Sequence, residues 1–69
     1  MNKPYLKKFG ENLKKIRHNK GLTQDDLASE EVSRSMISLL ELGRTDVTIS
    51  KLKVIAKNLG VEIKELFEF

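Results

Sequence analysis

Few side chains in this chain of 69 residues are suited to acid–base, nucleophilic or metal chemistry. His18 is the only histidine, and no nucleophile or carboxylate motif accompanies it at a recognisable spacing. The absence of cysteine removes disulfides, thiolate metal sites and a thiol nucleophile. One histidine without cysteine does not make an ordinary zinc site. We therefore expect a protein that is not an enzyme and that holds no metal ion or cofactor.

The chemistry that remains is hydrogen bonding by a polar cluster in the middle of the chain. Ser33, Arg34 and Ser35 are consecutive, and Ser38 follows them by about one helical turn. Hydroxyl groups donate and accept hydrogen bonds, and a guanidinium group offers five donors in a fixed plane.

The net charge of +3 is unevenly distributed along the chain. Residues 1–21 carry seven Lys/Arg against one acid, which gives +6, whereas residues 22–43 carry one arginine against five acids, which gives −4. Residues 44–69 carry five Lys/Arg against four acids, which gives +1. The excess of positive charge is compatible with nucleic acid, but the polar cluster lies in the acidic segment, which counts against a purely electrostatic interaction.

Apolar residues recur at intervals of three or four along most of the chain, and nothing alternates like a strand. Glycines and capping residues divide this pattern into segments. The sequence predicts a compact all-α bundle of five helices: 5–20, a short one after Thr23 that buries Leu27 and Ala28, 34 to about 42, 49–59 with Ile49, Leu52, Ile55, Ala56 and Leu59 on one stripe, and roughly 62–67.

The length of the chain fits one domain, which we expect to span residues 1–69. No apolar run approaches the roughly 20 residues needed to cross a bilayer, and residues 1–10 lack the apolar centre of a secretion signal. We expect a cytoplasmic protein with no membrane partner. No ligand-binding domain for a small molecule is expected, so regulation would work through protein concentration and dimerisation.

The order of several short motifs resembles the repressor-type (XRE) helix-turn-helix domains of phage repressors, restriction-modification controller proteins and many antitoxins. The resemblance covers nearly the whole chain and implies a lambda-repressor-like fold with a DNA-binding function. It rests on Lys15-Ile16-Arg17, Gly21-Leu22-Thr23-Gln24, Leu27-Ala28, Val32-Ser33-Arg34-Ser35, Ile37-Ser38, Glu41 with Gly43, and Ile55-Ala56-Lys57-Asn58-Leu59-Gly60-Val61.

The resemblance assigns roles to three residues outside the polar cluster. Gln24 matches the family glutamine that contacts a phosphate and braces the recognition helix. Arg17 and Glu41 match the family's internal ion pair between the first and third helices. A phosphate contact is the alternative for Arg17, and we favour the ion pair because a paired arginine is partly neutralised.

The third helix is the recognition helix in this family, and its early residues enter the major groove. Arg34 and Ser35 are therefore the first candidates for reading bases, and Arg34 can bind O6 and N7 of guanine with two hydrogen bonds. A solvent-exposed arginine that balances Glu30 and Glu31 is the alternative for Arg34. Ser33 has an equally good explanation as a helix cap.

Other residues extend this expected DNA-binding surface. Counting 100° per residue places Ser35, Ser38, Leu39 and Leu42 on the side of the third helix opposite to Ile37 and Leu40. Leu39 can pack on a thymine methyl group. Arg44 and Thr45 follow the helix and are expected to meet the DNA backbone.

The chain departs from the family in the turn before the third helix. Ala28 reaches Val32 through three residues, so the turn is one residue short and lacks the usual glycine. We expect the chain to turn by ending the second helix a residue early.

The leucines on the outward side of the third helix are a second departure, because relatives often have polar residues at these positions. Leu39 and Leu42, with the acidic middle segment, leave open an antitoxin-like or adaptor domain that binds a protein, with DNA binding secondary or absent.

This family normally pairs two domains across a two-fold axis, so we expect a homodimer on double-stranded DNA. Apolar residues concentrate near the end of the chain. The predicted dimer surface comprises Val54, Val61, Leu66, Phe67 and Phe69. The alternative for Leu66 and Phe67 is that they close the core of the monomer.

Overall fold

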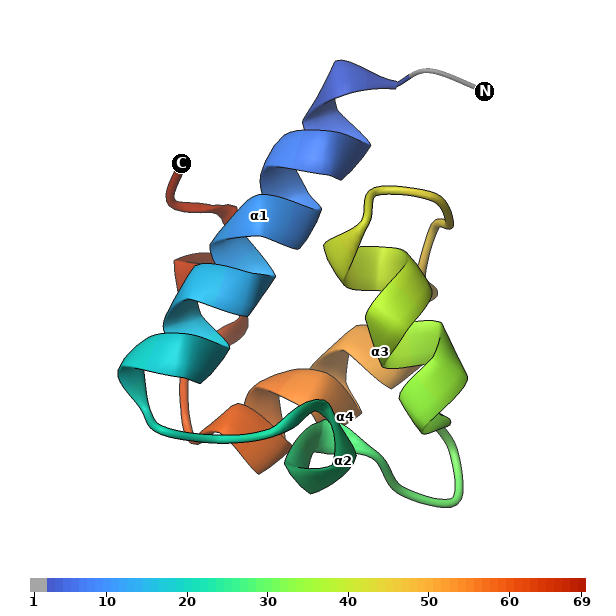
Figure 1. The fold of residues 1–69 in the computed structure, drawn as a ribbon, viewed down its shortest axis with the longest axis vertical. Coiled ribbons are helices and arrows are strands. Elements are labelled where there is room, and N and C mark those ends of the chain that lie inside the picture. Colours follow the sequence, from blue (N-terminus) through green and yellow to red (C-terminus); the bar gives the residue numbers. More distant parts are fainter. Residues whose placement is uncertain (1–2) are drawn as a thin grey trace.

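The computed structural model describes residues 3–69 and contains no strand within them. Four α-helices are followed by a final 3₁₀ helix, and the described chain extends over 27 × 23 × 19 Å. The helices α1 and α3 pack together but diverge toward their lower ends, with α2 and α4 below them and the end of the chain returning beside α1 (Figure 1). The elements are α1 (Pro4–Asn19), α2 (Gln24–Leu27), α3 (Arg34–Glu41), α4 (Ile49–Leu59) and η1 (Ile63–Phe67).

Capping residues define where the helices begin. The hydroxyls of Ser33 and Thr48 accept hydrogen bonds from the backbone N–H groups of Met36 and Lys51 at the starts of α3 and α4. Thr23 forms a reciprocal capping box with Asp26 at the start of α2. Because each cap satisfies a donor that the helix itself leaves free, the helix starts agree closely with the sequence prediction.

The expectation of five α-helices is wrong in its last element, because residues 63–67 form a 3₁₀ helix. This segment is only five residues long, and its carbonyl groups are engaged by another element. Nδ2 of Asn12 in α1 donates hydrogen bonds to the carbonyl oxygens of Glu65 at 3.1 Å and Leu66 at 2.9 Å. The rings of Phe9 and Phe67 also pack together, with centroids 5.2 Å apart. Tertiary contacts therefore fix a short 3₁₀ turn where periodicity alone suggested an α-helix.

All four α-helices and η1 contribute to the core, which is made of aliphatic side chains with one phenylalanine. Ile49 is an exception to the predicted stripe of α4, because it is 81% exposed. It occupies the first position of the helix, at the margin of the stripe, where no element covers it. The buried hydrophobic residues are Phe9, Leu13, Leu27, Val32, Ile37, Leu40, Leu52, Ile55, Ala56, Leu59 and Leu66.

The turn between α2 and α3 is made without a left-handed residue, because no non-glycine residue in the described chain has a positive φ. The helix α2 ends at Leu27, and Ala28 is extended at φ −77° and ψ 153°. The N–H of Ser29 then donates to the carbonyl of Val32 at 2.8 Å, which closes the turn. The second helix thus ends before Ala28, which lies half-buried outside it.

The helices α1 and α3 approach each other closely at Gly10. A Cβ atom at this position would lie 2.2 Å from the carbonyl oxygen of Leu40 and 2.7 Å from that of Glu41. Only a glycine allows the backbones to come this near without a shift.

Among residues 3–69, no helix has both the length and the apolar character that a membrane span requires.

Candidate nucleic-acid interface

The helix α3 presents a mixed polar and apolar face to solvent. Arg34 and Ser35, at its start, are exposed. Leu39 is 43% exposed and Leu42, directly after the helix, is 58% exposed. The opposite face, with Ile37 and Leu40, is fully buried. The division of this helix into two faces therefore agrees with the count of 100° per residue.

The serines of this segment differ in their surroundings. Oγ of Ser33 accepts the hydrogen bond from the N–H of Met36 at 3.1 Å, so its hydroxyl already serves as the N-cap of α3. Ser33 and Ser35 are exposed, whereas Ser38 is half-buried. Ser35 is therefore the exposed serine whose hydroxyl does not cap α3.

A buried network fixes α3 against the first two helices. The guanidinium of Arg17 donates from Nε to Oε2 of Glu41 at 2.6 Å and from Nη2 to Oε1 at 3.0 Å. Both residues are 7% exposed. Nη1 of Arg17 also donates to the carbonyl of Leu22 at 2.9 Å. The ion pair that the resemblance implied is thus present, and its two-point geometry sets the orientation of α3.

Gln24 belongs to the same network. Its Nε2 donates to Oε1 of Glu41 at 3.0 Å, which links the start of α2 to the end of α3. This contact supplies the bracing part of the role carried over from the family. The side chain is half-buried, so part of it remains accessible at the surface.

The pKa of Glu41 reflects two opposing effects. Burial raises the pKa of this carboxyl, whereas the hydrogen bonds from Arg17 and Gln24 and the positive charges of Arg17 and Lys14 lower it, and the net effect is a pKa below the usual value. The same bond from Arg17 to Glu41 raises the pKa of the guanidinium. The pair is therefore charged on both sides throughout the neutral range.

Acid should weaken the fold through Glu41. Its pKa is lower in the folded than in the unfolded chain, where a glutamate titrates at about 4.3. The carboxylate thus contributes stability above that value, and the contribution is lost as the pH falls through the folded pKa. We expect Glu41→Gln to make the urea midpoint less dependent on pH below about 5 than in the parent chain. An unchanged pH profile in this variant would contradict the assignment.

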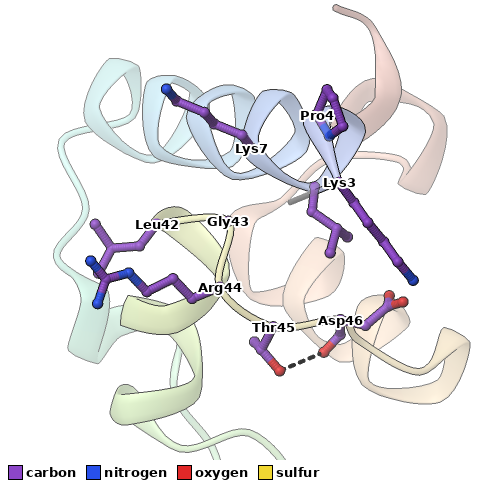
Figure 2. A pocket seen from close by; sticks show the side chains of 9 residues that line it. Lys3, Pro4, Lys7, Leu42, Gly43, Arg44, Thr45 and Asp46 are labelled. Carbon is purple, nitrogen blue, oxygen red and sulfur yellow. Dashed lines mark hydrogen bonds between the residues drawn. The ribbon is translucent and has the colours of Figure 1, made fainter. Parts of the chain in front are cut away.

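The segment after α3 lies beside the start of α1 and forms a shallow cleft with it (Figure 2). Arg44 is exposed, and Oγ1 of Thr45 donates to the carbonyl of Asp46 at 3.3 Å. The lining residues are Lys3, Pro4, Leu6, Lys7, Leu42, Gly43, Arg44, Thr45 and Asp46. The sequence prediction named Arg44 and Thr45 but did not connect them with α1. Their proximity to α1 depends on the close packing at Gly10 and Gly43.

The residues of the predicted dimer surface do not form one exposed set. Leu66 is fully buried, so it belongs to the core of the monomer and is not available for a contact between subunits. Val54 and Val61 are half-buried against the core. Phe67 and Phe69 are 51% and 56% exposed, although one face of Phe67 packs on Phe9.

Comparison with known proteins identifies the arrangement of these helices. A helix-turn-helix domain family matches residues 10–68. The chain belongs to this family. The match includes the whole of α2 and α3 together with the connecting turn, so the short glycine-free turn is a variation within the helix-turn-helix domain.

Three similar proteins are named as control or controller proteins. The chain is 36% identical to control protein C.BamHI of Bacillus amyloliquefaciens over 88% of its own length and 78% of the relative's, and 36% identical to control protein C.MunI of a Mycoplasma species over 87% and 84%. The crystal structure of the restriction-modification controller protein C.AhdI from Aeromonas hydrophila superposes with a TM-score of 0.84 at 36% identity, covering 90% of this chain and 91% of that one. The resemblance to controller proteins is confirmed. The chain is also 39% identical to an HTH-type transcriptional regulator of Sinorhizobium fredii over 87% of its own length and 79% of the relative's.

Proposed function

We propose that this protein is a transcriptional regulator that binds a two-fold symmetric DNA operator as a homodimer, and that it has no catalytic activity of its own. The observation that carries the proposal is the exposed face of α3, held rigidly by the Arg17–Glu41–Gln24 network. A recognition helix must keep its orientation to place side chains against base edges. The relatives named as control proteins support the same role.

In this proposal, residues at the start of α3 contact the base edges. Arg34 is the first residue of the helix and Ser35 the second, and both are exposed. The guanidinium of Arg34 fits O6 and N7 of a guanine, and the exposed Leu39 one turn further on fits a thymine methyl group. Ser38 borders the same face, and Ser33 supports it as a cap. Gln24, Arg44 and Thr45 contact phosphates and set the register.

The homodimer forms through the C-terminal part of the chain in this proposal. Phe67 and Phe69 expose more than half of their surfaces, and the half-buried Val54 and Val61 extend the apolar area. Aromatic side chains exposed in this way are typical of interfaces between subunits. A dimer would place two recognition helices in successive major grooves, about 34 Å apart or a multiple of that distance.

The proposal is tested by selecting bound molecules from a pool of random DNA duplexes near 0.15 M salt and sequencing them. A two-fold symmetric motif with half-sites about one helical turn apart supports a dimeric regulator. The absence of a motif, with loss of retention at that salt, contradicts DNA reading. The second candidate function is then binding of a protein partner, through Leu39 and Leu42 together with the acidic middle segment. The exposure of the two leucines favours this candidate.

Arg34→Ala is expected to relax the preference for one base pair in each half-site by about 1–3 kcal/mol. The matched control is Arg44→Ala, which removes the same charge from an exposed residue outside α3. A phosphate contact carries no base information, so Arg44→Ala should weaken binding equally to all sequences. Repeating the selection with both variants measures the difference. An unchanged motif with Arg34→Ala would assign this arginine to solvent or to phosphate.

A further inference from the structure

The cleft between the start of α1 and the segment after α3 places cations from both elements next to the recognition helix (Figure 2). Its lining includes three basic residues, Lys3, Lys7 and Arg44, against one acid, Asp46. In Figure 2 the side chains of Lys7 and Arg44 extend to the same side as Leu42, whereas Lys3 extends to the side of Asp46. Lys7 and Arg44 are therefore the two cations on the side of Leu42, Lys7 from α1 and Arg44 from the segment after α3.

The position of Lys7 is determined by packing at Gly43. A Cβ atom on Gly43 would lie 2.7 Å from Cα of Lys7, so the backbone of α1 rests directly on the end of α3 at this point. Gly43 also has a φ of +71°, which lets the chain reverse after α3. Lys7 is thus held beside the last turn of the recognition helix by the backbone itself.

The position of Arg44 is fixed as well. Its N–H donates to the carbonyl of Leu39 at 3.0 Å, and the N–H of Gly43 donates to the carbonyl of Leu40 at 3.0 Å. This pair of bonds closes the C-terminus of α3 in a Schellman arrangement. The backbones that carry Lys7 and Arg44 therefore keep a constant relation to the exposed face of α3.

Neither cation is neutralised by the protein. Within residues 3–69 the structure contains one ion pair, between Arg17 and Glu41, so Lys7 and Arg44 have no carboxylate partner there. Leu42, which is 58% exposed, is an apolar residue on their side of the cleft. Two unpaired cations beside an apolar side chain match the chemistry of a nucleic-acid backbone, which alternates anionic phosphates with apolar faces of sugars.

We propose that Lys7 and Arg44 form a phosphate clamp, in which α1 and the segment after α3 grip the DNA backbone beside the recognition helix. This inference rests on the proposed function and adds α1 to the DNA interface. The clamp is continuous with the reading face, since Leu42 and Arg44 directly follow α3. A phosphate held there fixes how deeply α3 enters the groove without reading sequence.

A different explanation for the two cations is stabilisation of the fold. Basic side chains near the C-terminus of a helix interact favourably with its dipole, and both residues lie near the end of α3. That role predicts a lower melting temperature on neutralisation and no change in the salt dependence of DNA binding. The two explanations therefore differ in a measurable quantity.

The test is Lys7→Gln, with Lys8→Gln as the matched control. Lys8 is the next residue of α1, is exposed and loses the same charge, but does not line the cleft. Affinity for the duplex selected from the random pool is measured between about 0.05 and 0.3 M salt. We expect Lys7→Gln to weaken binding about fivefold per subunit at 0.15 M and to lower the slope of log K against log salt by about 0.9 per lost contact. The selected motif should not change.

The outcomes separate this inference from the proposed function. Equal slopes for Lys7→Gln, Lys8→Gln and the parent chain, with the parent still selecting a motif, overturn the clamp and leave the regulator intact. A lower melting temperature for Lys7→Gln with an unchanged slope assigns the lysine to the dipole of α3 and also overturns the clamp. A parent chain that selects no motif overturns both.

Discussion

Gly10→Ala is expected to remove most of the stability of this protein. The added methyl group would lie 2.2 Å from the carbonyl oxygen of Leu40, and a backbone atom cannot move aside as a flexible side chain can. Overpacking of this kind typically costs about 1–3 kcal/mol, and contact with the backbone argues for the upper end. Alanine recovers only about 0.5–1 kcal/mol through its better helix propensity. A domain of this size has only about 3–5 kcal/mol to lose.

Thermal and urea unfolding followed by circular dichroism measure this effect. A loss of about 2–3 kcal/mol corresponds to a melting temperature lower by roughly 10–20 °C. The control is Glu11→Ala, at the next position of α1, which is exposed and should leave the melting temperature nearly unchanged. If Gly10→Ala melts like the parent chain, α1 and α3 are farther apart in solution than this fold requires.

Much of the fold follows from local signals in the sequence. Thr23, Ser33 and Thr48 mark the starts of three helices, and each one caps its helix in the structure. Capping depends on a side chain and a backbone donor three residues apart, so the necessary information is contained in a short stretch of sequence. The expectation for the turn before α3 had a different basis, because it came from comparing this short, glycine-free turn with the turn usual in the family that the chain resembles.

The predictions were wrong where the conformation or burial of a residue depends on contacts with residues distant in the sequence. The 3₁₀ form of residues 63–67 depends on hydrogen bonds from Asn12, more than 50 positions earlier. Leu66 was assigned to a dimer surface because it is apolar and near the chain end, but α1 and α4 cover it. Ile49 shows the converse, since its spacing fits the stripe while its place at the start of α4 leaves it uncovered. Periodicity gives a residue's direction on its helix and does not say what covers that position.

The candidate site likewise combines residues that local signals predict and residues that only long-range contacts place. The outward face of α3 follows from counting positions along one helix, so Arg34, Ser35 and Leu39 could be named from the sequence. The Arg17–Glu41 pair spans 24 positions and was available only through resemblance to a family. Lys7 was not among the predicted DNA-binding residues, because its place beside α3 is set by the close approach at Gly43.

Glu41→Ala is expected to destabilise the fold by about 3–5 kcal/mol, the usual cost of removing one partner from a buried ion pair. The guanidinium of Arg17, which is 7% exposed, would keep only the carbonyl of Leu22 as a partner. Nε2 of Gln24 would lose its acceptor as well. Because this network links α1, α2 and α3, its loss should also weaken DNA binding by allowing α3 to reorient. Urea unfolding at pH 7 followed by circular dichroism measures the first effect, and a variant without a folded baseline also agrees with it, because the expected cost approaches the whole stability of a domain of this size. Duplex binding measures the second effect at a temperature where the variant is folded.

The double variant Arg17→Met with Glu41→Leu separates the cost of an unpaired charge from the value of the pair itself. Well-packed apolar side chains often replace a buried ion pair with little loss of stability, because the penalty for desolvating two charges disappears. We expect the double variant to unfold at a higher urea concentration than Glu41→Ala and yet to bind DNA less well than the parent chain. Apolar contacts fill the space but lack the two directional bonds that orient α3. If the double variant is as unstable as Glu41→Ala, the ion pair itself stabilises the fold; if it binds DNA as well as the parent, the network does not orient the recognition helix.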